Sequence, residues 1–270
     1  EFIGPPPETI DAMGNKVNAK ETMKKIGIPV IYGSDGIVQS VQEAKDEADK
    51  AGYPVMLKAS AGGGGKGMRF VENEEQIETA FNSAQSESEM SFNNGDLYLE
   101  KFIPSMRHVE VQILRDQHGY AKVLGLRDCS VQRNNQKLLE ESGSGALDDS
   151  LRREILSSAE ALAHSVDYIG AGTVEFIYDL TDNSVYFMEM NTRLQVEHPV
   201  TEAVCGINIV EQQIHIATGG TIADLEPATN GYAIEARITA EKVAVVSKEI
   251  VTTPSPGLIN HLKLPVWDDI

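Results

Sequence analysis

Apolar residues recur at helical spacing in several stretches of the chain. Between residues 8 and 25, Ile10, Met13 and Val17 lean to one side of a helix, and Gly27 follows as at a helix end. This stretch is therefore predicted to form one helix. The same criteria predict helices over residues 41–50, 148–166 and 209–217, and one that begins near Asn73.

Short apolar or alternating runs predict the strands. These runs cover residues 55–59, 68–71, 97–101, 108–114, 121–127, 173–178, 185–190 and 233–239. The fourth and fifth runs lie on either side of a turn at Gly119, and the sixth and seventh lie around Asn183, so each pair is predicted to be an antiparallel hairpin. The pattern as a whole predicts an α+β protein.

The order of these elements suggests how the chain is divided. Residues 1–30 form a helical lead-in, residues 31–102 carry the strands and helices of a compact α+β unit, and residues 103–270 are rich in strands. We therefore expect three regions with these boundaries.

Charge and cysteine content narrow the class of protein. Acidic residues number 41 against 23 Lys plus Arg, so the net charge of -18 argues against binding to nucleic acid or to an anionic membrane. Cys129 and Cys205 lie far apart, which makes a disulfide framework unexpected and favours a reducing compartment. No apolar run approaches the ~18 residues of a membrane span, and no secretory signal is present, so a cytoplasmic location is expected.

A glycine-rich loop follows the predicted strand at residues 55–59. Lys58 precedes the loop, which contains Gly63, Gly64, Gly65, Lys66 and Gly67. The loop lacks the Ser or Thr that a Walker A motif places after its lysine. Glycines between two strands still allow backbone N–H groups to approach phosphate oxygens, so we favour phosphate binding over a surface loop without a ligand.

Three polar residues of the second hairpin are candidates for a metal site. Glu189 and Asn191 are two residues apart on one predicted strand, and Glu175 on its partner strand can reach the same face. Carboxylate and amide oxygens suit Mg²⁺ or Mn²⁺ bridged to nucleotide phosphates. A solvated strand face is the alternative, but apolar neighbours such as Phe187 and Met190 make a half-buried strand the better interpretation.

Four further charged residues could take part in chemistry. Arg193 could bind a small planar anion, and Glu197 could act as a base beside it, although a structural ion pair between them is the alternative. Lys137, in a dense polar stretch, could neutralise a transferred phosphate, unless that stretch is simply exposed. Arg237 shares a strand face with Glu235, for which a salt bridge is the simpler role.

The ordered series of these motifs resembles biotin carboxylase, the ATP-grasp component of biotin-dependent carboxylases. The resemblance runs over nearly the whole chain and includes Glu189-Met190-Asn191-Thr192-Arg193 and Gln195-Val196-Glu197-His198-Pro199. Its other segments are residues 2–5, 13–16, 58–68, 100–102, 107–110, 127–130 and 201–202.

The resemblance implies an ATP-grasp fold and a ligase reaction. Residues 31–102 would be a small mobile lid, and the rest would form an antiparallel central domain that is incomplete at its C-terminal side. Bicarbonate would attack the γ-phosphate of MgATP, and the carboxyphosphate formed would carboxylate biotin held on a separate carrier domain or protein. A carboxyltransferase would then use the carboxybiotin. The full-length protein of this family can form a dimer.

The resemblance also implies a role for each candidate residue. Lys16, Lys58, Lys66 and the loop glycines Gly63, Gly64, Gly65 and Gly67 would bind phosphates, and Glu100, Lys101, His108 and Gln132 would contact the rest of the nucleotide. Glu175, Glu189 and Asn191 would bind the metal, and Arg193, Gln195 and Val196 would hold bicarbonate. Glu197 would deprotonate bicarbonate, Lys137 would stabilise the transferring phosphate, and Arg237 would stabilise the biotin enolate.

Departures from the family pattern leave two alternatives open. Asn134-Asn135 stands where the family usually has Arg-His, residues 242–251 form a longer Val-rich stretch, and no Ala-Met-Lys-Met biotin-attachment motif is present. One alternative is another ATP-grasp ligase of the carbamoyl-phosphate synthase type. The other is an ATP-binding fragment that does not turn over.

Overall fold

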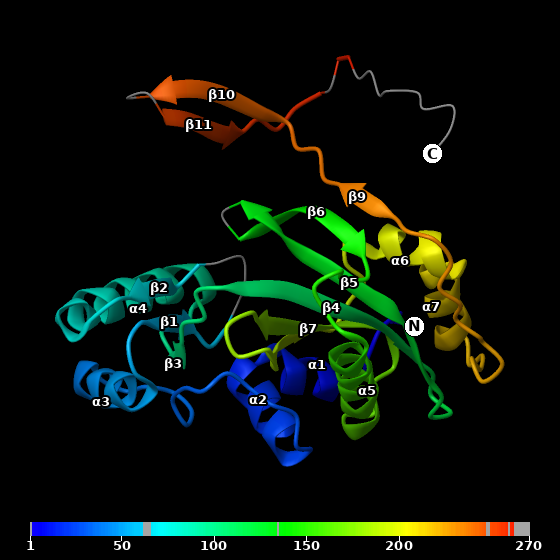
Figure 1. Cartoon of the computed structure of the whole chain (residues 1–270), viewed down its shortest axis with the longest axis horizontal. Coiled ribbons are helices and arrows are strands. Elements are labelled where there is room, and N and C mark those ends of the chain that lie inside the picture. Colours follow the sequence, from blue (N-terminus) through cyan, green and yellow to red (C-terminus); the bar gives the residue numbers. More distant parts are fainter. Residues whose placement is uncertain (1, 62–65, 134, 247–248, 259, 262–270) are drawn as a thin grey trace. The chain divides into compact units, whose positions relative to one another are not determined.

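Figure 1 shows the computed structural model, which describes residues 2–61, 66–133, 135–246, 249–258 and 260–261. The helices are α1 (Pro7–Gly14), α2 (Lys16–Lys25), α3 (Val41–Ala51), α4 (Ile77–Phe92), α5 (Asp149–Ser165), α6 (His198–Cys205) and α7 (Ile209–Ala217), with a 3₁₀ turn η1 (Glu74–Gln76). The strands are β1 (Val55–Ala59), β2 (Met68–Val71), β3 (Leu97–Lys101), β4 (Met106–Arg115), β5 (Ala121–Arg133), β6 (Gln136–Ser142), β7 (Gly170–Asp179), β8 (Ser184–Asn191), β9 (Ile234–Ala236), β10 (Glu241–Val246) and β11 (Glu249–Pro254). This mixture confirms the predicted α+β class.

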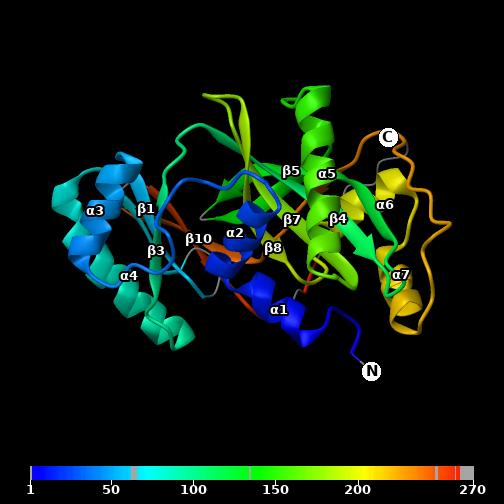
Figure 2. The same cartoon turned by 90° about the horizontal axis from the view of Figure 1, so that it is seen from below.

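The largest sheet has six antiparallel strands in the order β8-β7-β4-β5-β6-β9. Along β4 the side chains alternate between its two faces. Val109, Val111 and Ile113 are buried in a core that also contains residues of α1, α2 and α5. Figure 2 shows these three helices over one face of the sheet. The polar residues of β4 therefore lie on the opposite face, which carries the candidate site.

A smaller sheet, in the order β2-β1-β3, packs against α3 and α4 (Figure 1). Leu57 of β1 and Leu99 of β3 are fully buried in this second core. Lys58 and Glu100 alternate with these leucines and so lie on the other face of the small sheet. Strand alternation thus separates the core of this region from its charged residues.

Residues 237–270 form a separate compact unit. Its described part contains the antiparallel hairpin of β10 and β11, in which Val243 lies opposite Thr252 and Val245 lies opposite Ile250. This hairpin accounts for the Val-rich stretch at residues 242–251. The predicted division at residues 31 and 103 stays a prediction.

Several predicted elements are confirmed at or near their predicted bounds. The strands at residues 55–59, 68–71 and 97–101 and the helix at residues 209–217 have the predicted limits, and both predicted hairpins are present. The strand predicted over residues 121–127 continues to Arg133. The one predicted over residues 233–239 is limited to Ile234–Ala236.

The single helix predicted over residues 8–25 was wrong. The chain forms two helices, because the Asn15 side chain caps the second one by accepting hydrogen bonds from the backbone N–H groups of Val17 (3.0 Å) and Asn18 (3.1 Å). Strand β6 and helix α6 were not predicted. β6 lies in a polar stretch without strand alternation. α6 is a helix of only eight residues, although two buried valines in it are four positions apart, as expected on one face of a helix.

Among the described residues, no helix has both the length and the apolar character needed to cross a membrane.

Candidate functional site

A row of charged side chains crosses the polar face of the large sheet. Glu189 of β8 is the cross-strand partner of Glu175 of β7, which is in turn the partner of Glu110 of β4, and Glu110 faces Arg127 of β5. Cross-strand partners on one face have Cβ atoms only about 4.5–5.5 Å apart. The sheet register therefore brings three carboxylates together from separate parts of the chain.

Lys137 lies among the carboxylates of this row. Its Nζ donates to Glu110 Oε2, to Glu175 Oε1 at 2.9 Å and to Glu197 Oε1 at 2.6 Å. Lys137 comes from β6, and Glu197 comes from the loop that leads into α6. The structure thus brings together three of the predicted site residues, and adds Glu110.

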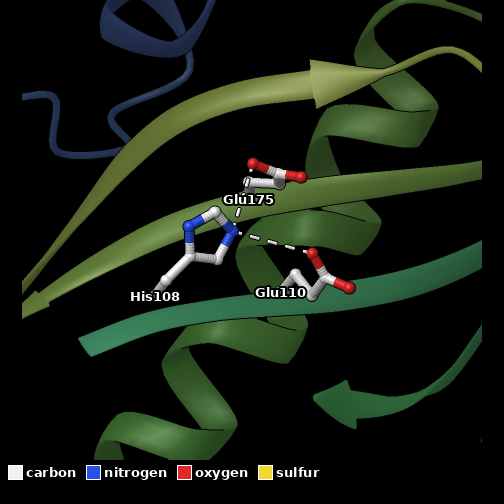
Figure 3. A group of neighbouring side chains, drawn as sticks. All are labelled: His108, Glu110 and Glu175. Carbon is white, nitrogen blue, oxygen red and sulfur yellow. Dashed lines mark ion pairs between the residues drawn. The ribbon is translucent and has the colours of Figure 1, made fainter. Parts of the chain in front are cut away.

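Figure 3 shows His108 with its Nε2 atom directed toward two carboxylates of the row. The Nε2 atom lies 3.1 Å from Glu175 Oε2 and 3.7 Å from Glu110 Oε2. On the other side of the ring, Gln132 Nε2 lies 3.3 Å from Nδ1. His108 and Gln132, both predicted nucleotide contacts, are therefore neighbours, and His108 lies beside the two middle carboxylates of the row.

The pKa values in this cluster reflect burial opposed by neighbouring charges. Burial alone would lower the pKa of His108, but the Glu175 and Glu110 carboxylates raise it to about 9. Burial would raise the pKa of Glu175, yet His108 and Lys137 lower it to about 2. Burial would lower the pKa of Lys137, but Glu110, Glu175 and other anionic groups raise it above its ordinary value. All three groups are therefore charged at neutral pH.

Arg127 is the most extensively bonded side chain of the site, and its role was not predicted. It is fully buried, and its Nε lies 2.6 Å from Glu110 Oε1. Its two terminal nitrogens donate to four further oxygens, namely Gln112 Oε1 (2.9 Å), Thr201 Oγ1 (2.8 Å), Thr173 Oγ1 (3.3 Å) and Gln195 Oε1 (3.4 Å). The guanidinium therefore links β4, β7, α6 and the loop before α6.

Two sets of three side chains in this cluster have the ligand types of a metal site. One is His108, Glu110 and Glu175, drawn in Figure 3, and the other is Glu110, Cys129 and Glu197. In both sets the carboxylates already accept from Lys137 or Arg127, so an ammonium and a guanidinium supply the positive charge. We therefore interpret both sets as parts of one ion-paired network.

The three residues predicted to bind metal lie side by side on β7 and β8. Asn191 Nδ2 donates to Glu175 Oε1 at 2.9 Å, and Glu189 Oε2 lies 3.3 Å from Lys16 Nζ. The Glu189 side chain is 26% exposed, whereas Glu175 is buried. This set presents two carboxylates and one amide oxygen, the hard donors that Mg²⁺ prefers.

A second charged cluster lies where α2 meets the small sheet. Glu100 of β3 pairs with Lys58 of β1 and also with Lys20 of α2, a residue that was not predicted. Burial and the nearby Lys16 lower the pKa of Lys58 to about 8. Since Lys16 also pairs with Glu189, it connects this cluster with the carboxylates of the large sheet.

The loop before α6 divides the predicted bicarbonate residues into buried and exposed ones. Gln195 is buried, with its side-chain oxygen accepting from Arg127 and its nitrogen donating to Glu175 Oε1 at 2.9 Å. Arg193 is exposed and donates to the carbonyl of Leu194 at 3.2 Å. Val196 is 53% exposed. Glu197 pairs with Lys137, and no ion pair between Arg193 and Glu197, the structural alternative to their predicted roles, is formed among the described residues.

Other predicted residues have local partners or lie apart. Lys101 Nζ donates to the carbonyls of Gly52 (2.6 Å) and Tyr53 (3.0 Å). Gly67 has a φ of +67° and little room for a Cβ beside Ala59, which explains the need for glycine there. Its N–H donates to Glu87 at 3.0 Å, and Lys66 is exposed. Gly63, Gly64 and Gly65 lie outside the described residues, and Arg237 is the first residue of the second unit.

Cys129 and Cys205 do not form a disulfide with each other, and both are buried. Burial raises the pKa of the Cys129 thiol, and Glu110 adds to this effect. Cys129 is therefore a protonated thiol at neutral pH.

One weak pattern in the sequence indicates that two polar residues of β4, which were not predicted to belong to the site, have buried partners. Glu110 and Gln112 are polar residues that alternate with Val109, Val111 and Ile113 on a strand buried on both faces. Such a pattern requires polar partners across the sheet. Those partners, including Arg127, come from other strands and cannot be identified from the local sequence.

Comparison with known proteins places the chain among ATP-binding domains. The model of the family described as carbamoyl-phosphate synthase L chain, ATP binding domain, matches residues 15–225. Biotin carboxylase 1 of Bacillus subtilis is 48% identical over 262 residues, which cover 96% of this chain and 57% of that protein. Biotin carboxylase of Nostoc is 50% identical over 261 residues, again covering 96% and 57%. The chain thus spans slightly more than half the length of these relatives.

Solved structures of biotin carboxylases are also similar to the chain, among them the following two. A biotin carboxylase of Campylobacter jejuni in complex with β-γ-ATP has a TM-score of 0.87 and 48% identity, covering 89% of this chain and 54% of that one. The biotin carboxylase domain of 2-oxoglutarate carboxylase from Hydrogenobacter thermophilus, a dimer in complex with MgADP, ADP and bicarbonate, has a TM-score of 0.86 and 48% identity, with coverages of 89% and 53%.

Proposed function

This chain belongs to the family of ATP-binding domains of the carbamoyl-phosphate synthase L chain, and from its similarity to biotin carboxylases we propose that it is the ATP-grasp core of a biotin carboxylase. The predicted ATP-grasp fold is confirmed by its likeness to the two solved biotin carboxylase structures. The proposed reaction is the ATP- and bicarbonate-dependent carboxylation of biotin on a carrier.

One observation carries the proposal, namely the continuity between the two charged clusters. Lys58 and Lys16 lie at one end, Glu189 and Glu175 follow, and Lys137 with Glu197 lies at the other end. Phosphoryl transfer needs cations along the phosphates, hard oxygen donors for a metal and a base at the attacking group. The order of these side chains matches the order in which those demands arise along an ATP molecule.

The proposed reaction uses Lys137 and Glu197 together. A bicarbonate oxygen attacks the γ-phosphorus, the bond between that phosphorus and the β–γ bridging oxygen breaks, and ADP leaves with the electron pair of that bond. Glu197 accepts the bicarbonate proton, and Lys137 neutralises charge on the phosphoryl group in transfer. N1 of biotin then attacks the carboxyl carbon of carboxyphosphate. The bond from that carbon to the phosphate oxygen breaks, and phosphate leaves with the electron pair and takes up the N1 proton.

The residues present fit a magnesium ion. Its ligands would be Glu175, Glu189 and Asn191. The Glu189 side chain is 26% exposed, so it is more accessible to solvent than the buried Glu175. When bound, the ion would neutralise phosphate charge and orient the phosphates. The Glu189 carboxylate would then contact both the magnesium ion and the Lys16 ammonium.

The remaining assignments concern bicarbonate, biotin and partner proteins. Arg193 is exposed and available to an anion, whereas Val196 has no polar side-chain group and could contribute only its backbone N–H. Arg237 is assigned to the biotin enolate. The proposed partners are a biotin carrier protein or domain and a carboxyltransferase, in keeping with the relatives that are biotin carboxylases.

A second candidate is a ligase that passes the acyl phosphate to ammonia. The matched family model is described by carbamoyl-phosphate synthase, which supports this candidate. The biotin carboxylases that match at 48–50% identity over 96% of the chain favour the first one.

The testing experiment measures ADP release from MgATP by this chain, with and without bicarbonate, and with free biotin or ammonium added. A parallel calorimetric titration with a non-hydrolysable ATP analogue reports nucleotide binding alone. We expect bicarbonate-dependent release that biotin stimulates. Stimulation by ammonium instead would support the second candidate, and binding without release would indicate a nucleotide-binding fragment.

The metal assignment has its own test. Glu189→Gln should weaken binding of the Mg²⁺–analogue complex, because one charged ligand is lost, and should abolish turnover. Binding of the analogue in the presence of EDTA should change less. Full activity of this variant would contradict the assignment.

A further inference from the structure

Arg127 has a bonding pattern that stability alone does not explain. Its guanidinium is fully buried, and each of its three nitrogens has at least one acceptor. Burying a guanidinium is costly, and an apolar side chain of similar volume often stabilises a core as well or better. A planar fork with five donors instead fixes the relative positions of the groups that accept from it.

Two of these acceptors lie on either side of Glu197 in the chain. Arg127 Nη2 donates to Gln195 Oε1 at 3.4 Å, two residues before Glu197, and Nη1 donates to Thr201 Oγ1 at 2.8 Å, four residues after it. Glu197 is the N-cap residue of α6, yet its side chain makes no capping hydrogen bond. Its position is therefore set by contacts outside its own helix.

The Nε atom of the same guanidinium bonds Glu110, a carboxylate partner of Lys137. Arg127 Nε lies 2.6 Å from Glu110 Oε1, and the second oxygen of that carboxylate accepts from Lys137. Lys137 in turn donates to Glu197 Oε1 at 2.6 Å. Side-chain contacts therefore run from Arg127 through Glu110 and Lys137 to Glu197, and Arg127 also bonds the segment that carries Glu197.

We propose that Arg127 is a positioning residue for the reaction: it holds the chain on both sides of Glu197 and thereby sets the distance between the Glu197 carboxylate and the bound bicarbonate. This inference rests on the proposed function, in which Glu197 is the base. Arg127 itself is inaccessible to solvent and acts only through Gln195, Thr201 and Glu110. Misplacement of a reacting group by about 1 Å can lower a rate by about 10²-fold.

The principal test replaces one acceptor of Arg127 and leaves the guanidinium in place. Thr201→Val removes the hydroxyl but keeps the shape of the side chain, and Thr201→Ser restores the hydroxyl. The matched control is Thr9→Val, because Thr9 is also buried and also loses one hydrogen bond, from Oγ1 to the carbonyl of Val166 (3.2 Å), away from the charged row. Arg127→Lys keeps the charge and removes the fork.

The readouts are kcat and KM for bicarbonate in ADP release, Kd for the non-hydrolysable ATP analogue, and Tm. We expect Thr201→Val to lower kcat about tenfold with an unchanged Kd, Thr201→Ser to retain most of the wild-type kcat, and Arg127→Lys to lower kcat by up to about 10²-fold. Thr9→Val should lower Tm by as much as Thr201→Val but keep the wild-type kcat.

Equal kcat values for Thr201→Val and Thr9→Val would overturn the inference while leaving the proposed function intact. A wild-type chain that binds the analogue but shows no bicarbonate-dependent release would overturn the proposed function, and the inference with it. If Arg127→Lys does not fold, the Thr201 pair and its Thr9 control still decide the question.

Discussion

Two half-buried lysines, Lys58 and Lys137, carry the same ammonium group and have opposite pKa shifts. Lys58 shares one carboxylate, that of Glu100, with Lys20 and lies near a further ammonium on Lys16, and its pKa falls to about 8. Lys137 is bonded to three carboxylates, and its pKa is raised despite burial. The ratio of neighbouring charges, and not burial alone, decides the direction.

Because their ratios of cations to carboxylates differ, the two clusters are suited to different functions. The Lys58 cluster has an excess of cations, so an arriving polyphosphate would relieve repulsion that is already present. In the Lys137 cluster, three carboxylates face Lys137, Arg127 and a protonated His108, so charge is balanced without a ligand. The first cluster is suited to attract a ligand and the second to hold groups in place.

Removing the cation of the balanced cluster should cause the largest loss of stability. Lys137→Met leaves Glu110, Glu175 and Glu197 close together with one cation fewer, so we expect a loss of about 3–5 kcal/mol in the free energy of unfolding and no turnover. Urea unfolding followed by circular dichroism measures the stability, with the exposed Lys24→Met as the control. A loss no greater than that of the control would mean that the cluster is not a balanced unit.

Removing one carboxylate instead of the cation should affect turnover more than stability. Glu197→Gln keeps the size of the side chain and leaves Lys137 with two carboxylate partners, so the fold should persist. We expect bicarbonate-dependent ADP release to fall about 10²–10⁴-fold, because a general base acts on the chemical step. The affinity for the ATP analogue should be unchanged in calorimetry. Retained turnover would mean that the base lies elsewhere.

The cation-rich cluster should respond in the opposite way. In Lys58→Met, Glu100 keeps Lys20 as its partner and the unfavourable charge of the Lys58 ammonium is removed, so the free energy of unfolding at pH 7 should stay the same or rise. The affinity for the ATP analogue should fall about tenfold or more, the contribution of one charge-assisted hydrogen bond. A large loss of stability with unchanged affinity would reverse the roles given to the two clusters.

The pH dependence of stability tests the two pKa shifts directly. The pKa of His108 is raised from 6.5 to about 9, so its stabilising contribution is complete below pH 6.5 and is lost as pH rises to about 9. The pKa of Lys58 is lowered from 10.5 to about 8, so its unfavourable contribution is relieved as pH rises from 8 to 10.5. Urea unfolding across these ranges should show His108→Gln removing the falling slope and Lys58→Met removing the rising one. Unchanged slopes in either variant would contradict the corresponding pKa shift.

Local patterns were sufficient for most of the fold. The strands at residues 55–59 and 97–101 and the helix at residues 209–217 follow from alternation, helical spacing and neighbouring turn residues, which act over a few positions. The end of α1 and the start of α2 at Asn15 are also set locally. They depend on whether the Asn15 side chain accepts hydrogen bonds from the backbone N–H groups that follow it. β6 is different, because its polar residues become a strand by pairing with β5.

Only part of the candidate site was predicted, because the site also depends on pairing between strands. Lys137, Glu175, Glu189 and Glu197 were candidates from their motifs, and they do lie along one face of the large sheet. Glu110 and Arg127 were not assigned roles, since the importance of each depends on partners brought in by other strands. Lys101 was expected at the nucleotide, but its ammonium donates to two carbonyls of the turn before β1.

By itself the sequence determined which side chains face the cores and which carry charge, because the twofold period of a strand is a local property. It also determined the family, through motifs kept in order along the chain. Only the tertiary structure decided which charges are neighbours, and thus why Lys58 and Lys137 differ and why Arg127 bonds both sides of Glu197. Coulomb energy depends on distances between residues far apart in the chain, and only the sheet register sets those distances.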